Sequence, residues 1–225
     1  KCNTTGNCNV AVGACGLWSN TSGGCNAAVG FKALFSNTTG VTSVAVGHSS
    51  LQNSTSGLGN TAIGNRSLFS NTTGSCNVAM GSAALESATT AVCNTAIGTY
   101  SLISDTTGQL NTALGALAGC SVTTGGNNVA IGARAMCATT TGERNVIIGT
   151  DALRLNTIGS CNTAVGQLTL YANTSGKQNT AIGSEAIKCN TSGIRNVAVG
   201  VQSLFNNTTG SANTASGGYA LHSHT

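Results

Sequence analysis

Cysteine is the residue type in this chain with the clearest capacity for covalent chemistry. Six of the ten cysteines form three pairs with the same 17-residue spacing: Cys8 with Cys25, Cys76 with Cys93, and Cys120 with Cys137. No Cys-x-x-Cys motif occurs, and His48 lies far from these pairs in the sequence, so a metal site is the weaker alternative. We predict disulfides at these pairs. Such cysteine use favours an extracellular location or the surface of a cell or virion.

Four further cysteines, namely Cys2, Cys15, Cys161 and Cys189, have no partner at this spacing. They are candidates for disulfides between chains. A bond between Cys2 and Cys15 within one chain is the alternative for that pair.

Asparagine-linked glycosylation is a second chemistry that the sequence offers. Seven Asn-x-Ser/Thr sequons recur at one position of a repeat, at Asn3, Asn20, Asn37, Asn71, Asn173, Asn190 and Asn207. Sugars there would form a ridge along the chain. The alternative is a turn without sugar, because Asn-Thr-Thr-Gly is also typical of turns.

Five of the eight aromatic residues share another repeat position: Trp18, Phe35, Phe69, Tyr171 and Phe205. The same position also holds charged residues such as Glu86 and Arg154, so it is not a closed core. We expect a contact stripe between chains here, with binding of a glycan or matrix protein as the alternative.

Catalytic chemistry has no support in the sequence. The five carboxylates are scattered, and the three histidines have no serine, aspartate or cysteine arrangement around them. We therefore expect neither enzymatic activity nor a cofactor or metal. The net charge of +4 is spread thinly, without the basic cluster of a nucleic-acid-binding protein, and no apolar run approaches about 20 residues, the length of a membrane span.

The elements that position these residues come from a strict repeat. A phrase of the type Asn-Thr-Ala-Ile-Gly occurs thirteen times with an unbroken 17-residue period, from Asn9 to Asn213. We number its Asn as repeat position 1. Position 5 is always Gly and position 15 is Gly in every copy except at Ala91, which predicts two bends per repeat.

The columns of the repeat separate an inside from an outside. Positions 4 and 9 are almost always apolar and are predicted to form the interior stack. Positions 3 and 8 hold small residues, which predicts a close contact with either the opposite wall of the coil or another chain. All fourteen charged residues occupy positions 7, 10, 12, 16 and 17, which we expect to face solvent. The Asn of position 1 and the Thr of position 13 are expected to form structural ladders between coils.

A 17-residue period with two glycines leaves no room for two helices and favours parallel β-coils. The predicted fold is all-β: a parallel β-solenoid, or β-roll, of about 13 stacked coils, continuous over residues 1–225 and with incomplete first and last coils. Because stacked coils lie about 4.8 Å apart, cysteines separated by one repeat come within disulfide distance.

Phrases such as Asn60-Thr-Ala-Ile-Gly64 and Asn128-Val-Ala-Ile-Gly132 resemble the head repeats of trimeric autotransporter adhesins. The longer phrase from Gly64 to Gly74 is similar to repeat arrays in tail-fibre-like surface proteins of bacteria and viruses. The resemblance implies a left-handed β-roll that trimerises and binds host or matrix surfaces. The 17-residue period is longer than the coil of that family.

The sequence thus predicts a structural, self-assembling extracellular fibre subunit whose partner is itself, as a homo-oligomer or an end-to-end filament. An adhesin or tail-fibre stalk that binds glycan or matrix is the alternative. An ice-binding protein is a third hypothesis, because solenoids with ranks of Thr present a regular face. It would need two outward Thr columns two positions apart.

Overall fold

The computed structural model describes residues 3–224, in two compact units, one ending at Leu110 and one beginning at Asn111. Both units are parallel β-solenoids with one three-residue strand per coil. The first unit contains β1 (Val10–Val12), β2 (Ala27–Val29), β3 (Val44–Val46), β4 (Thr61–Ile63), β5 (Val78–Met80) and β6 (Thr95–Ile97). The second contains β7 (Thr112–Leu114), β8 (Val129–Ile131), β9 (Val146–Ile148), β10 (Thr163–Val165), β11 (Thr180–Ile182), β12 (Val197–Val199) and β13 (Thr214–Ser216).

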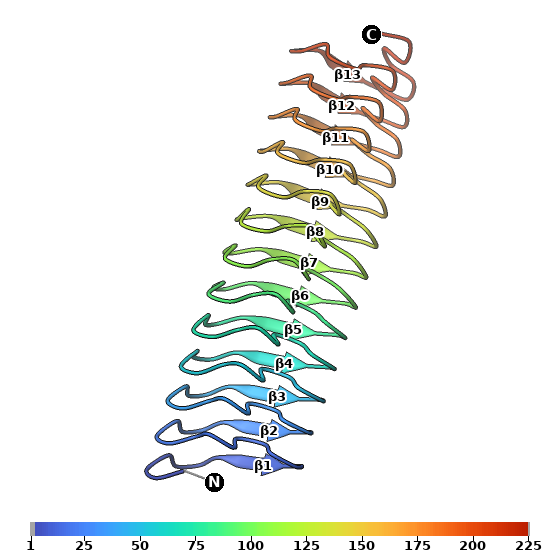
Figure 1. Ribbon diagram of the computed structural model, residues 1–225. Coiled ribbons are helices and arrows are strands. Elements are labelled where there is room, and N and C mark those ends of the chain that lie inside the picture. The colour runs from blue at the N-terminus through green and yellow to red at the C-terminus, as the bar shows by residue number, and fades with distance from the viewer. Residues whose placement is uncertain (1–2, 225) are drawn as a thin grey trace. The chain divides into compact units, whose positions relative to one another are not determined.

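Within each unit, every strand pairs in parallel with the next along the chain, and the register is shifted by one repeat. Ala28 pairs with Ala45 in the first unit, for example, and Ala164 pairs with Ala181 in the second. Figure 1 shows the strands of each unit following one another along one wall of the coils. The predicted all-β solenoid with 17-residue coils is confirmed, and continuity of the two units stays a prediction.

The backbone of each coil has positive φ at position 5 and at three further positions, but not at the Gly of position 15, which is the second bend that the sequence indicated. The Gly of position 5 has a positive φ of 113–143° and in most coils lies directly against the next coil, so no side chain fits there. Positions 7, 9 and 17 also adopt left-handed backbone, although most of them hold residues with side chains, such as Lys32, Leu34 and Cys25. Each of these three residues donates its backbone N–H to a neighbouring coil, at 2.9–3.0 Å. These hydrogen bonds help to hold a conformation that non-glycine residues otherwise disfavour.

The interior of each coil lies between two walls. The Ala of position 3 is buried on the strand side, and the Leu, Ile or Met of position 9 is buried on the other, as in Ala62 and Leu68. At Gly16, in position 8, an added Cβ would lie 3.6 Å from Ala11 Cβ and 3.9 Å from Ala28 Cβ. The small residues of positions 3 and 8 therefore face each other across a thin coil. Of the two close contacts predicted for these columns, the one with the opposite wall of the coil is the one present.

The interior assignment of position 4 was wrong. Side chains at positions 2 and 4 of the strands point outward, since successive residues of a strand alternate between its faces. The interior side of a three-residue strand thus receives only its middle residue, position 3. Of the two apolar columns predicted to be interior, position 9 is confirmed and position 4 lies on the surface.

Two asparagine ladders run along the interior. At position 1, Asn162 donates its backbone N–H and its Nδ2 to Asn145 Oδ1, at 3.0 and 3.2 Å. At position 12, Asn190 Nδ2 donates to Asn173 Oδ1 at 2.7 Å and to Gly193 O at 3.2 Å. The predicted position 1 ladder is confirmed. Position 12, expected to face solvent, is interior, and its one charged member, Asp105, is fully buried and accepts the Gly108 N–H at 2.7 Å.

Threonines of position 13 form a third ladder, as predicted. The backbone N–H and the hydroxyl of Thr38 both donate to the carbonyl oxygen of Thr55, at 2.9 and 3.0 Å. The hydroxyl groups of this column are therefore engaged with the next coil. Among residues 3–224 no helix is long and apolar enough to cross a membrane.

Candidate interaction surfaces

The first candidate surface is the outer sheet face, which we define as the outward side chains at positions 2 and 4 of the strands. Its most exposed apolar residues have exposures of 36–57%: Val10, Val12, Val29, Val44, Val46, Met80, Ile97, Val146, Ile148, Ile182, Val197 and Val199. The remaining members are apolar residues or carry a hydroxyl group, mainly as threonine at position 2, and no charged residue occurs at either position. Parallel sheets are normally covered on both faces, so an exposed uncharged face of this kind is unusual.

The second candidate surface is the corner strip, formed by positions 7 and 10. These two columns lie close enough for their side chains to touch. All four ion pairs of residues 3–224 join members of the strip. Three of the four cation–π contacts also lie within it, and in each a cation at position 7 or 10 lies 4.2–5.6 Å from an aromatic ring centre at position 10.

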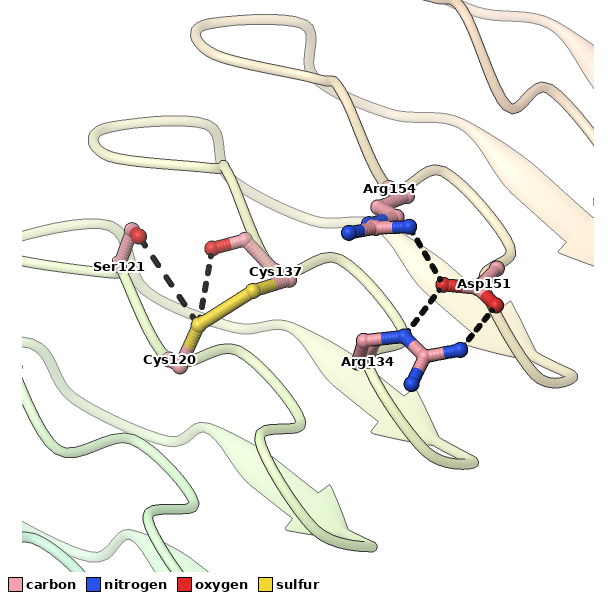
Figure 2. Close-up of a disulfide and its surroundings, with 6 residues drawn as sticks. All are labelled: Cys120, Ser121, Arg134, Cys137, Asp151 and Arg154. Atoms are coloured by element: carbon pink, nitrogen blue, oxygen red, sulfur yellow. Dashed lines mark hydrogen bonds and ion pairs between the residues drawn. A yellow bond between two sulfur atoms is a disulfide. The ribbon is translucent and has the colours of Figure 1, made fainter.

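In the second unit the corner strip is built from ion pairs. Arg134 donates from Nε and Nη2 to the two carboxylate oxygens of Asp151, at 2.8 and 2.7 Å, and Arg154 Nη1 lies 3.4 Å from the same carboxylate. Figure 2 shows both guanidinium groups pointing toward Asp151. Hydrogen bonding from Arg134, with the charges of both arginines, holds the pKa of Asp151 below its usual value despite its partial burial.

A second carboxylate of this strip has one cationic and one neutral hydrogen-bond donor. Glu185 accepts from Lys188 Nζ at 2.9 Å and from Gln202 Nε2 at 2.6 Å, and these hydrogen bonds lower its pKa. Lys188 also lies 5.4 Å from the ring centre of Phe205. The cations of the second unit's strip are therefore already paired with carboxylates.

The predicted aromatic stripe is present only in pieces. Trp18 and Phe35 stack at 6.4 Å between ring centres, whereas Phe69 instead lies under the guanidinium of Arg66. In the second unit, Tyr171 and Phe205 are separated in their column by Lys188. The five aromatics thus share a repeat position, but within neither unit do they form one continuous surface.

The structure forms one of the three predicted disulfides. Cys120 and Cys137 are bonded at position 10, with Cα atoms 5.0 Å apart, beside the arginine cluster (Figure 2). At position 17, Cys8, Cys25, Cys76 and Cys93 are exposed free thiols, so the two disulfides predicted there are not formed in this structure. Their φ values of 57–59° place them in a left-handed bend that the cysteines of position 10 lack.

The remaining cysteines are also unpaired where the structure describes them. Cys161 is exposed, and Cys15 and Cys189 are half-buried free thiols, while Cys2 lies outside the described residues. A bond between chains at these cysteines stays a prediction.

The predicted glycosylation column lies inside the coil, apart from the exposed Asn3. Its other members are buried in the position 12 column: Asn20, Asn37, Asn71, Asn173, Asn190 and Asn207. The nitrogen that would carry a sugar donates to the Gly of position 15, as Asn20 Nδ2 does to Gly23 O at 2.9 Å. A glycan on these six residues would require this hydrogen bond to break and the side chain to leave the interior. The geometry therefore supports the interpretation of these six sequons as turns without sugar, and it argues against a ridge of glycans along the chain.

The first unit also contains three functional candidates that sequence reasoning missed. Phe31 and His48, both at position 6, stack at 5.2 Å between ring centres, and Lys32 Nζ lies 5.3 and 5.6 Å from the ring centres of Phe31 and Phe35. The signal was available, since Phe31 and His48 are separated by one repeat and therefore occupy adjacent coils.

Metal ligation has no geometric support in the part of the chain that the structure describes. No group of three or more His, Cys, Asp or Glu side chains gathers within residues 3–224.

Comparison with protein-family models, curated proteins and solved structures finds no match to the chain.

Proposed function

We propose that the chain is a structural, self-assembling extracellular fibre subunit whose copies associate through the outer sheet face. The observation that carries the proposal is the exposure of that face. It places two outward side chains per strand, all uncharged, at the same spacing in coil after coil. Burying apolar side chains of this kind removes apolar area from water, which favours association and offsets the cost of ordering two copies.

A second copy of the chain is the partner that fits this face best. The face is narrow, since each strand has three residues, and it gains area only by repetition along the solenoid. A partner must therefore offer apolar groups over the same length and at the same coil spacing, which another copy does by construction. Self-association of one patch gives a closed pair of copies, so growth of such pairs into a fibre takes a second contact besides this face.

Two further observations support a structural role outside the cell. The Cys120–Cys137 disulfide is typical of an oxidising compartment. Three of the five carboxylates, Glu86, Asp151 and Glu185, are held in ion pairs with cations of the corner strip, which favours a stabilising role for them over a catalytic one.

The ice-binding hypothesis requires Thr hydroxyl groups that face ice. The hydroxyl groups of position 13 instead donate to the next coil, which argues against this column as an ice-binding face. The adhesin or stalk alternative is compatible with a self-associating fibre and concerns a different surface, the corner strip.

Charge on the outer sheet face tests the proposal. Ile97 and Ile182 are outward strand residues, one in each unit, with exposures of 38% and 41%. The double variant Ile97→Lys/Ile182→Lys should dissociate the assemblies, because lysine at the centre of an apolar contact is buried without a partner. Electron microscopy and light scattering after size-exclusion chromatography measure the assembly.

Leu58 and Ile194 provide the matched control. Both lie at position 16, outside the strands that form the outer sheet face, with exposures of 47% and 37%. Leu58→Lys/Ile194→Lys should assemble like the unchanged protein. A monomeric unchanged protein, or a face variant that still assembles with unchanged circular dichroism, would contradict the proposal.

A further inference from the structure

The first unit carries an exposed cluster that the proposed assembly does not use. We call it the aromatic patch: Trp18, Phe31, Lys32, Phe35 and His48, from three successive coils. Trp18 and Phe31 are exposed by 47% and 44%, and the rings are ordered by stacking, Trp18 on Phe35 and Phe31 on His48. The patch is therefore a set of aromatic rings held in place by their neighbours and open to solvent.

The charge of the patch is not neutralised by the protein. Lys32 Nζ lies between the rings of Phe31 and Phe35, at 5.3 and 5.6 Å from their centres. The ion pairs formed within residues 3–224 engage Arg66, Arg134, Arg154 and Lys188, and Lys32 takes part in none of them. An ammonium group held over aromatic rings without a carboxylate is available to an external anion.

We propose that the aromatic patch binds an acidic polysaccharide. The apolar C–H face of a pyranose ring packs against an exposed aromatic ring, which here is Trp18 or Phe31. The carboxylate of a hexuronate unit then pairs with Lys32. Because the five residues come from consecutive coils, the patch extends along the solenoid and suits an extended chain of sugars.

Contact between two copies explains the patch less well. A symmetric contact would place Lys32 of one copy near Lys32 of the other, since each copy brings the same patch. Two ammonium groups without a carboxylate would then be buried together, which is unfavourable. This binding is independent of the proposed assembly through the outer sheet face.

Titration calorimetry with an oligogalacturonate tests the inference, with a cello-oligosaccharide of equal length as the neutral ligand. The acidic ligand should bind, more weakly at high salt, and the neutral ligand should bind less tightly. Trp18→Ala and Lys32→Gln should each weaken binding by about tenfold or more.

The second unit supplies a control with similar local chemistry. Lys188 also lies over an aromatic ring, that of Phe205, but it is ion-paired with Glu185. Lys188→Gln and Phe205→Ala should therefore leave binding unchanged. The inference is overturned by absent binding of the acidic ligand, by equal affinity for the neutral one, or by equal loss in the second-unit variants, provided circular dichroism is unchanged.

Discussion

The interior ladders and the corner strip are built from the same 17-residue repeat but follow opposite rules. In the ladders of positions 1 and 13, each residue hydrogen-bonds to the residue one coil away, as Asn145 does with Asn128 and Asn162. In the corner strip, a residue contacts partners of many kinds: Trp18 meets a ring, Cys120 a disulfide partner, and Arg134 a carboxylate.

The difference shows what keeps a column uniform. At position 1, a buried amide finds partners in the adjacent coils, and the same residue type offers matching donors and acceptors from one step to the next. A half-exposed side chain has water as an alternative partner, so its column tolerates change. We therefore expect large losses of stability from substitutions in the coil interior and at its tight turns, and small, condition-dependent losses from those in the strip.

The largest loss is expected at the position 5 turn. At Gly132, with φ of +128°, an added Cβ would lie 2.7 Å from the backbone carbon and oxygen of Gly149. Gly132→Ala should destabilise the second unit by about 4 kcal/mol, from a strained backbone and a clash that backbone atoms cannot avoid. Denaturant unfolding followed by circular dichroism measures the change.

Gly218 is the matched control for that substitution. It lies in the same unit, and an added Cβ there meets no atom within 4 Å. Gly218→Ala should change the unfolding free energy by less than about 0.5 kcal/mol. Similar losses for the two variants would show that the close approach of coils does not limit position 5.

An intermediate loss is expected in the ladder itself. Asn145 Oδ1 accepts from the backbone N–H and Nδ2 of Asn162, and its Nδ2 donates to Asn128 Oδ1 and Gly159 O. Asn145→Ala leaves several of these buried groups without a partner and should cost about 2–3 kcal/mol in unfolding free energy. Denaturant unfolding is again the measurement.

A natural break in the ladder supplies the comparison for Asn145. At Ser43, the hydroxyl oxygen still accepts the backbone N–H of Asn60, at 3.2 Å. Asn145→Ser should therefore retain one of the four contacts and lose less stability than Asn145→Ala. Equal losses would mean that the backbone N–H contact contributes nothing measurable to the ladder.

The same contrast explains how much the sequence could predict. The strands, the buried Leu column, the position 1 Asn ladder and the Thr ladder were all visible, because repetition makes these interior columns uniform. The bends at positions 7, 9 and 17 were hidden, because residues such as Lys32 and Leu34 carry no sign of a positive φ. Position 4 was misplaced for a related reason. Its uniform Val and Ile residues look like a core column, whereas the structure places them on the outer sheet face.

Contacts in the corner strip were beyond a column-by-column reading. A column relates each residue to its equivalents in other coils. The contacts of Lys32 with Phe35 and of Asp151 with Arg154 join two different columns and depend on how closely position 7 approaches position 10. That approach depends on the left-handed bends at positions 7 and 9. The same missing bends therefore concealed both the backbone path and the candidate site.

The smallest loss, and one that depends on pH, is expected for Asp151. Its pKa is lowered in the folded chain, first by the hydrogen bonds from Arg134, so the ionised form stabilises the fold. This contribution is fully present above the unfolded pKa of about 3.9 and is lost as the pH falls through the lower, folded pKa. Asp151→Asn keeps a residue type that tolerates the left-handed backbone at φ of 55°. It should lower the melting temperature at pH 7, and the difference from the unchanged protein should shrink as the pH falls through the folded pKa and the Asp151 side chain becomes neutral.

Glu143 distinguishes this local contact from the general effect of removing a negative charge. It is an exposed carboxylate of the same unit whose side chain joins none of the ion pairs within residues 3–224. Glu143→Gln removes the same charge, and its melting temperature should follow that of the unchanged protein at each pH. If both variants lose stability equally at pH 7, net charge and not the Arg134 contact is responsible. If Asp151→Asn alone loses stability and the loss shrinks in acid, even the variable corner strip stabilises the coils, by contacts that water only partly replaces.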